Sequence, residues 1–241
     1  MQFPRRPSVV IFDKDGTLID FVAMWGNWAE AFIARVCSTV SAELRLPLYE
    51  AIGMDPITKK IQSDGALAIA PEATTQRAIA TLVQQHGVAP NDALALVQRL
   101  WQAPDPTATA VPCADLPALF AWIRADGCLI AVATADNRAP TQATLQSLGI
   151  AHAIAAIACA DDPGVAPKPA PDKILVICNA LAVHPREAIM VGDTPSDMLM
   201  GKNAGVMACV GVTTGVCQQP ELAVYADVVL DNVGQLKLLW R

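Results

Sequence analysis

The sequence predicts an α/β protein with a mostly parallel sheet and an inserted, all-helical domain. Two observations carry this prediction. From about residue 111 onward, short apolar segments alternate with helical segments, which is the pattern of repeated βα units. Residues of roughly 20 to 107 break that alternation, because they have helical periodicity but contain no strong strand.

The first strand is predicted at Val9–Phe12, where consecutive apolar residues indicate burial on both faces. The later strands are predicted at similar apolar runs, at 128–134, 154–159, 188–191, 206–210 and 228–230. The helices between them are predicted at 115–126, 140–148, 171–182 and 197–204. Asp115 is the expected N-cap of the first of these helices, and glycines such as Gly127 and Gly205 are expected to end them.

The inserted helical block divides the chain into two expected domains. Residues 1–18 and 108–241 are predicted to form the α/β core, and residues 19–107 the helical domain. Prolines separate the helical stretches of the block, at Pro47, Pro56, Pro71 and Pro90. A hinge or linker is predicted around 104–109, where prolines and threonines cluster. We expect the block to lie over the strand ends, with hinges near 18–20 and 106–112.

Composition excludes several classes of protein. The formal net charge is −6, with 23 acidic and 17 basic residues and no long basic block, so nucleic acid is a poor candidate partner. No apolar stretch approaches the roughly 20 residues that a membrane span needs, so no membrane partner is expected. The seven cysteines form no CxxC pair, which favours reduced, structural thiols in a cytoplasmic protein.

A chemical motif follows the first strand directly. Asp13, Asp15, Gly16 and Thr17 fall in one tight turn at the carboxyl end of Val9–Phe12. Ligands of open α/β sheets bind beyond the carboxyl ends of the strands. Two carboxylates so close together repel each other unless a cation or a shared proton relieves them. The turn therefore implies a hard metal ion, an anionic substrate, or both.

Three further groups fall at the ends of predicted strands. Thr134 closes the strand at 128–134, Lys168 lies in the proline-rich segment 166–172, and Asp193 and Asp197 follow the strand at 188–191. The carboxyl ends of parallel strands share one edge of the sheet, so these groups are expected to converge on one site. Acid, hydroxyl and ammonium groups together are what phosphoryl transfer requires.

In these four motifs, and in their order, the chain resembles the haloacid dehalogenase-like superfamily of phosphohydrolases. The resemblance covers nearly the whole length, and the helical insert is typical of phosphoglycolate phosphatases and related small-molecule phosphatases. It implies a Rossmann-like three-layer core with an inserted α-helical cap domain. It also implies a small phosphorylated metabolite as the partner, in a monomer or a homodimer.

The resemblance assigns roles to the acidic residues. Asp13 is expected to be the nucleophile, and Asp15 the general acid and then the general base. The implied cofactor is Mg²⁺, held by the Asp13 carboxylate, the Asp15 backbone carbonyl and Asp193. Asp197 is expected to support these ligands from behind rather than to bind the metal directly.

The phosphate group is expected to meet a second set of residues. These offer a hydroxyl, an ammonium or backbone amides, and they are Gly16, Thr17, Thr134 and Lys168. Two positions depart from the family pattern. Ala135 stands where an asparagine is common, and Lys14 stands where an apolar residue is usual. Lys14 either leans on the substrate or cap, or pairs with a nearby acid.

Substrate specificity is expected to come from the cap. One edge of its first helical segment either lines the pocket or packs in the cap core, with Phe21, Met24, Trp25 and Trp28. Cap cations that could meet a substrate carboxylate are Arg35, Lys59, Lys60 and Arg77.

The sequence thus favours a Mg²⁺-dependent phosphatase that works through an aspartyl-phosphate, with phosphoglycolate as the favoured substrate. The first alternative is a sugar phosphomutase of the same superfamily, which retains both catalytic acids. A dehalogenase is disfavoured because Asp15 supplies an acid that a dehalogenase lacks. From other classes, a phospho-accepting receiver domain would need only about half this length, and a scaffold protein would not need every catalytic position.

Overall fold

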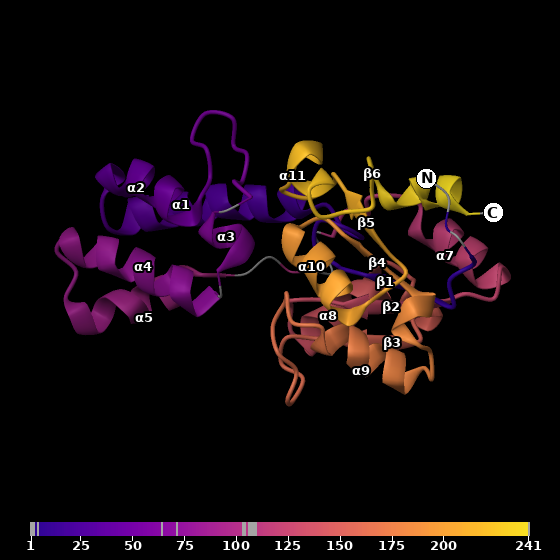
Figure 1. Ribbon diagram of the computed structural model, residues 1–241. Coiled ribbons are helices and arrows are strands. Elements are labelled where there is room, and N and C mark those ends of the chain that lie inside the picture. The colour runs from indigo at the N-terminus through magenta and orange to yellow at the C-terminus, as the bar shows by residue number, and fades with distance from the viewer. Residues whose placement is uncertain are drawn as a thin grey trace. The chain divides into compact units, whose positions relative to one another are not determined.

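The computed structural model describes residues 3, 5–63, 65–70, 72–102, 105 and 110–240. The chain forms two compact units, one of residues 1–21 and 106–241, the other of residues 22–105 (Figure 1). The predicted linker at 104–109, apart from Asp105, lies outside the described residues, as does Pro71.

The first unit is built on a six-stranded sheet in which every strand pair is parallel. Its strands are β1 (Val9–Phe12), β2 (Leu129–Ala133), β3 (Ala156–Ala158), β4 (Ala188–Gly192), β5 (Ala208–Val212) and β6 (Val228–Leu230). Their spatial order is β3-β2-β1-β4-β5-β6, which places the first strand of the chain in the middle of the sheet. This arrangement confirms the predicted α/β fold class. β5 begins two residues later than the predicted strand.

Helices cover both faces of this sheet, so the unit has three layers (Figure 1). On one face Val10 and Phe12 of β1 pack with α7 (Leu116–Ala125) and the 3-10 segment η5 (Val233–Leu239). On the other face Val9 and Ile11 pack with α9 (Asp172–Ala180) and α10 (Pro195–Ala204). Because neighbouring residues of β1 point to opposite faces and all four are buried, the strand needs an unbroken apolar sequence.

Local signals in the sequence set most helix ends. The Asp115 side chain accepts a hydrogen bond from the Ala118 amide at the start of α7, as expected of an N-cap. Gly205 ends α10 in the left-handed conformation. α10 begins at Pro195, earlier than predicted, because Thr194 and Asp197 form a capping box there. The remaining helical elements of this unit are α8 (Arg138–Ser147), η3 (Ala151–Ala153), η4 (Pro185–Glu187) and α11 (Gln219–Ala223).

Within the described residues, the regular elements of the second unit are all helical, and turns, loops and one isolated bridge between Met54 and Ile61 connect them. Its elements are η1 (Val22–Gly26), α1 (Asn27–Thr39), η2 (Ala42–Leu44), α2 (Arg45–Ile52), α3 (Ala66–Ile69), α4 (Glu72–Gln85) and α5 (Pro90–Leu100). Its aromatic centre is formed by Trp28, Phe32 and Trp101, whose rings lie 4.6 to 5.2 Å apart. Pro47 lies in the first turn of α2 rather than between helices.

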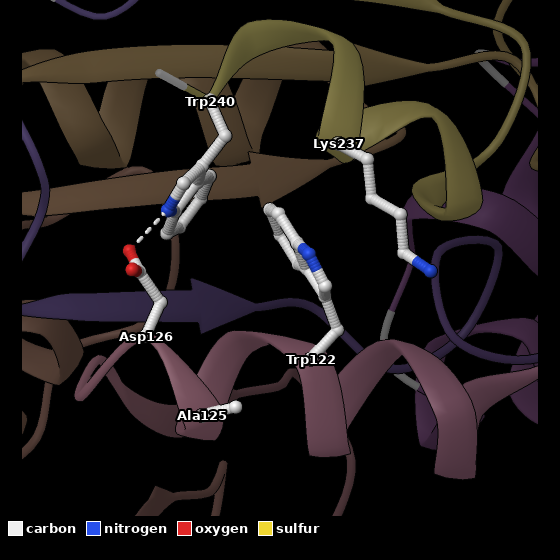
Figure 2. A pocket seen from close by; sticks show the side chains of 5 residues that line it. All are labelled: Trp122, Ala125, Asp126, Lys237 and Trp240. Atoms are coloured by element: carbon white, nitrogen blue, oxygen red, sulfur yellow. Dashed lines mark hydrogen bonds between the residues drawn. The ribbon is translucent and has the colours of Figure 1, made fainter.

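The two ends of the chain meet on the first unit. The Phe3 amide donates to the Leu239 carbonyl, and the Phe3 and Trp240 rings lie 5.7 Å apart, edge to face. Trp240 also donates its ring N–H to Asp126 and packs against Trp122, which lines an open depression of about 390 Å³ (Figure 2). Asp126 comes just before β2, so this depression lies toward the amino ends of the strands.

Two expectations from composition can be compared with the structure. In the described part of the chain, no helix has both the length and the apolar character that a membrane span requires. All seven cysteines are free, and five of them are buried.

Candidate active site

The predicted site residues converge at the carboxyl edge of the sheet. Asp13 follows β1, Thr134 follows β2 and Asp193 follows β4, and these three strands are neighbours. The Asp13 amide donates to the Val191 carbonyl at 2.8 Å, so the parallel ladder continues into the first residue of the site. The sheet itself therefore brings together residues that lie up to 180 positions apart.

The turn after Asp13 is closed by the Lys14 carbonyl, which accepts hydrogen bonds from the amides of Thr17, Leu18 and Ile19. Gly16 has a φ of 83°, a conformation that glycine adopts at little cost. Its carbonyl accepts a hydrogen bond of 2.6 Å from the Thr214 hydroxyl. The turn is thus tied to the loop after β5, which the sequence motifs do not include.

Lys168 binds two of the acids at once. Its ammonium Nζ lies 2.6 Å from Asp13 Oδ1 and 2.6 Å from Asp197 Oδ1, and about 9% of its side chain is exposed. Burial disfavours its charge, but Asp13 and Asp197 outweigh this and raise the pKa of Lys168. The ammonium therefore stays charged and fixes the direction of the Asp13 carboxylate. Two of its three N–H groups are used in this way.

Asp193 is enclosed by backbone. Its Oδ1 accepts a hydrogen bond of 3.2 Å from the Thr17 hydroxyl. A Cβ atom at Gly16 would stand 2.3 Å from its Oδ2, and one at Gly215 would stand 1.8 Å from it, so both neighbours must lack a side chain. Thr17 donates its amide to Lys14 and its hydroxyl to Asp193, so it orients this acid, while its expected contact with phosphate stays a prediction.

Asp197 caps its own helix and binds Lys168. Its Oδ2 accepts from the amide and the hydroxyl of Thr194, at 3.1 and 2.6 Å, while its Oδ1 accepts from Lys168. A Cβ atom at Gly192 would lie 2.4 Å from the Cβ atom of Asp197, so the missing side chain at position 192 leaves space for Asp197. Both oxygens of Asp197 have partners, which fits its expected supporting role.

Three of these acids form a cluster that fits a divalent cation. Carboxylate oxygens of Asp13, Asp193 and Asp197 all lie within 4.8 Å of one another, and all three side chains are buried. When all three carboxyl groups are ionised, their negative charge exceeds the single positive charge of Lys168 by two. Burial raises the pKa of Asp13 to about 7, with Asp197 and Asp15 adding to the effect and Lys168 opposing it. Burial, Asp13 and Asp197 likewise raise the pKa of Asp193 well above its usual range. Such excess negative charge is what a bound cation relieves.

Lys14 pairs with two acidic side chains. This is the second of the two alternatives that the sequence left open. Its ammonium lies 2.7 Å from Asp15 Oδ1 and 3.2 Å from Asp136 Oδ2, and the residue is 1% exposed. Burial opposes its charge, but the two carboxylates raise the pKa of Lys14 above its usual value.

The hydroxyl group of Thr134 is positioned to donate a hydrogen bond. Its amide donates to the Ala158 carbonyl, and its hydroxyl oxygen accepts from the Asp136 amide at 3.0 Å. That geometry leaves its O–H proton for another acceptor. Ala135, the residue after this threonine, is exposed and has no polar side chain to offer the site. The next residue, Asp136, is an acid.

The cap residues singled out by sequence lie mainly within the helical unit. Trp28 belongs to the aromatic centre of this unit, and the ring of Trp25 packs against it, with centroids 5.3 Å apart. Lys59 forms an ion pair of 2.9 Å with Glu30 and lies over the Tyr49 ring. Arg35 donates to a backbone carbonyl in α5, whereas Lys60 and Arg77 are exposed. Phe21 belongs to the α/β unit, and Met24 is buried.

Sequence motifs missed two parts of the site. Thr214 and Gly215 hold the catalytic turn and Asp193, but they belong to none of the four motifs. A signal was present, because the run Thr213-Thr214-Gly215 follows an apolar strand just as Asp13-to-Thr17 follows β1.

Known proteins are similar to this chain over most of its length. The model of the haloacid dehalogenase-like hydrolase family matches residues 7–205, which include every site residue of the four motifs. A phosphoglycolate phosphatase of Rhodospirillum rubrum is 28% identical over 230 residues, covering 95% of this chain and 89% of the relative. The Dickeya dadantii protein named "Probable phosphatase IndB" is 30% identical over 230 residues, covering 95% and 91%.

A solved structure is similar over the same length. The crystal structure of a HAD family hydrolase from Deinococcus radiodurans, with bound phosphate and sodium, superposes with a TM-score of 0.64. It covers 95% of this chain and 93% of that one, at 23% identity, which supports the fold.

Proposed function

Because this chain belongs to the haloacid dehalogenase-like hydrolase family and is a phosphatase, we propose that it hydrolyses small phosphate monoesters through an aspartyl-phosphate on Asp13. The observation that carries the proposal is the position of Asp13. Its carboxylate lies at the carboxyl edge of the sheet, is directed by Lys168, and has Asp15 two residues away. The relatives named phosphoglycolate phosphatase make phosphoglycolate the first substrate to test.

In the first half-reaction an oxygen of Asp13 attacks the phosphorus atom, and the bond from phosphorus to the ester oxygen breaks. Asp15 gives its proton to the departing alkoxide, which leaves as an alcohol. In the second half-reaction Asp15 takes a proton from water, and that water attacks the phosphorus atom of the aspartyl-phosphate. Inorganic phosphate leaves, and Asp13 returns to its carboxylate form.

The neighbouring residues hold the phosphoryl group in line for this displacement. Lys168 keeps one N–H beyond its bonds to Asp13 and Asp197, and we assign that N–H to a phosphoryl oxygen. The Thr134 hydroxyl donates to another oxygen. Asp13 and Asp193 belong to the buried acidic cluster and would hold Mg²⁺. The family resemblance adds the Asp15 carbonyl as a ligand, and the bound ion would neutralise negative charge between nucleophile and substrate. The helical unit of residues 22–105, which the sequence predicts at 19–107, is assigned the role of cap.

The test is the loss of phosphate release in Asp13→Asn. We expect no turnover of p-nitrophenyl phosphate or 2-phosphoglycolate by this variant in Mg²⁺ buffer, with wild-type circular dichroism and melting temperature. The matched control is Asp92→Asn, which changes an exposed acid of α5 and should retain full activity. Undiminished activity of Asp13→Asn would refute the nucleophile assignment.

The same assay separates a hydrolase from a mutase. A phosphatase releases inorganic phosphate in stoichiometric amounts without a bisphosphate activator. A panel of phosphate esters, each scored by kcat/KM, would identify the substrate class. Phosphoglycolate should rank high if the relatives' specificity is shared.

A further inference from the structure

Lys14 is a buried cation that the mechanism above does not use. About 2% of its side chain is exposed, whereas the side chains of its two partners, Asp15 and Asp136, are 23% and 31% exposed. Taking an ammonium out of water costs several kcal/mol unless well-placed partners compensate. The two carboxylates contact this ammonium directly. Any effect of Lys14 on the reaction therefore has to act through Asp15 or Asp136.

Asp136 is the fixed end of this contact. Its amide donates to Thr134 Oγ1 at 3.0 Å, its Oδ1 accepts from the Asn137 amide at 2.7 Å, and its carbonyl accepts from the Ala160 amide at 2.9 Å. These bonds leave Oδ2 directed at Lys14. Backbone and side chain of Asp136 are thus both held in place beside the threonine.

Asp15 is the adjustable end. An aspartate side chain turns about two bonds, and its rotamer decides whether its proton can reach the leaving oxygen. The bond of 2.7 Å from Lys14 to Asp15 Oδ1 selects one rotamer. Lys14 is itself anchored through its carbonyl, which accepts three amides of the catalytic turn.

We propose that Lys14 is a positioning residue that ties the carboxylate of Asp15 to Asp136 and thereby fixes the general acid relative to Thr134. The proposal rests on the proposed function, since it assigns Asp15 to proton transfer and Thr134 to phosphate. It explains why a lysine stands between the two acids: β1 and β2 are neighbours, and the ammonium links the turns that follow them.

Removal of the ammonium should affect the proton-transfer step. Without it, the bond that selects one rotamer of Asp15 is lost, and the Asp15 side chain can turn away from Asp136. A displacement of about 1 Å in a catalytic group can cost on the order of 10²-fold in rate. Hydrolysis of an alkyl ester needs the proton of Asp15, whereas p-nitrophenolate leaves without one. The loss should therefore depend on the leaving group.

The experiment is a double-mutant cycle with Lys14→Met and Asp15→Asn. Both are assayed with p-nitrophenyl phosphate and with the alkyl phosphate that the wild type hydrolyses fastest. Because Asp15 also serves the second half-reaction, which is common to both esters, the quantity compared is kcat/KM, which reports transfer of the phosphoryl group to Asp13. Lys14→Met should lower kcat/KM for the alkyl ester by about 10- to 100-fold and kcat/KM for the aryl ester far less. In the Asp15→Asn background, Lys14→Met should have no further effect on kcat/KM.

Lys173→Met is the matched control. Lys173 is also buried, but its ammonium donates to the Cys159 carbonyl, away from Asp15. Its loss should lower the melting temperature and change the two kcat/KM values in the same proportion. Should Lys14→Met fail to fold, Asp136→Asn tests the same link, because it keeps the acceptor for Asn137 but removes the charge facing Lys14. It should show the same leaving-group dependence.

Equal losses of kcat/KM for both esters in Lys14→Met, or a full additional loss in the Asp15→Asn background, would overturn the positioning role. So would wild-type kinetics in Lys14→Met while Asp13→Asn is inactive, and in that case the proposed function would stand. If the wild type hydrolyses neither ester, the proposed function fails, and the role of Lys14 fails with it.

Discussion

Gly215 forms one wall of the space that holds Asp193. A Cβ at position 215 would stand 1.8 Å from Asp193 Oδ2, closer than any real contact between such atoms. Position 215 therefore has no space for a side chain. The glycine allows the loop after β5 to lie directly against the carboxylate of Asp193, which we assign as a metal ligand. Thr214, one residue earlier, holds the same loop to the Gly16 carbonyl.

Gly215→Ala should displace Asp193 and weaken metal binding. We expect the Mg²⁺ concentration for half-maximal activity to rise on the order of 10- to 100-fold, as when outer partners of metal ligands are altered. A Mg²⁺ titration of phosphate release measures this. Gly26→Ala is the control, because a Cβ there would meet Val22 at an ordinary 3.6 Å and its Mg²⁺ requirement should not change.

Asp193 and Asp197 should differ in what their loss changes. Asp193→Ala should raise the Mg²⁺ requirement, because one of its oxygens accepts from the Thr17 hydroxyl and the other faces glycine backbone, which leaves lone pairs for a cation. Asp197→Asn should mainly lower kcat, because it removes a negative partner of Lys168 and loosens the direction of Asp13. Parallel Mg²⁺ titrations of the two variants test this. An unchanged titration for Asp193→Ala would remove it from the metal ligands.

The stability of the metal-free protein should fall as the pH rises from about 4 to about 7. Burial raises the pKa of Asp13 to about 7, so in this window the folded state keeps a proton that the unfolded state has lost. Stability decreases with pH wherever the folded state binds more protons. Melting temperatures in EDTA between pH 5 and pH 8 test this slope. Asp193, whose pKa is also raised, should contribute a slope of the same sign, so Asp13→Asn should reduce the slope rather than abolish it. A slope unchanged in that variant would contradict the assignment to Asp13.

The ion pair between Arg138 and Asp162 should contribute to stability near neutral pH. The guanidinium donates to both carboxylate oxygens at 2.7 Å, and Arg138 outweighs the effect of burial, so the pKa of Asp162 is lowered. Asp162→Asn should cost about 1 kcal/mol and lower the melting temperature by about 2–4 °C. Because the folded-state pKa is depressed, this contribution is present above the ordinary pKa and is lost as the pH falls through the lowered one.

Asp161→Asn is the control for that prediction, since its Oδ1 accepts from the Arg138 amide and an asparagine can do the same. A melting temperature as low as that of Asp162→Asn would show that the guanidinium pair has no special role. At pH 3 the difference between Asp162→Asn and the wild type should shrink.

The sheet and the meeting of the acidic residues could be predicted from the sequence because both depend on short-range signals. Each buried strand is a continuous apolar run, and each motif follows one directly, so the parallel topology fixes where Asp13, Thr134 and Asp193 meet. The fold class and the family resemblance are confirmed in this way.

Side-chain pairings were less predictable, because they depend on angles that a sequence pattern does not contain. The sequence left two options for Lys14, and the geometry of Asp136 decides between them. Gly215 was missed for a related reason. Its importance comes from contact with Asp193 across the fold, and the sequence offers only a glycine after a strand.

The central position of β1 also has a consequence for synthesis of the chain. The strand that carries Asp13 is made first, yet its neighbours β2 and β4 begin at Leu129 and Ala188. At a synthesis rate of about 5–20 residues per second, this apolar strand waits roughly ten seconds or longer for its second partner. The nucleophile is thus translated early but comes into place late, only after β4 has left the ribosome.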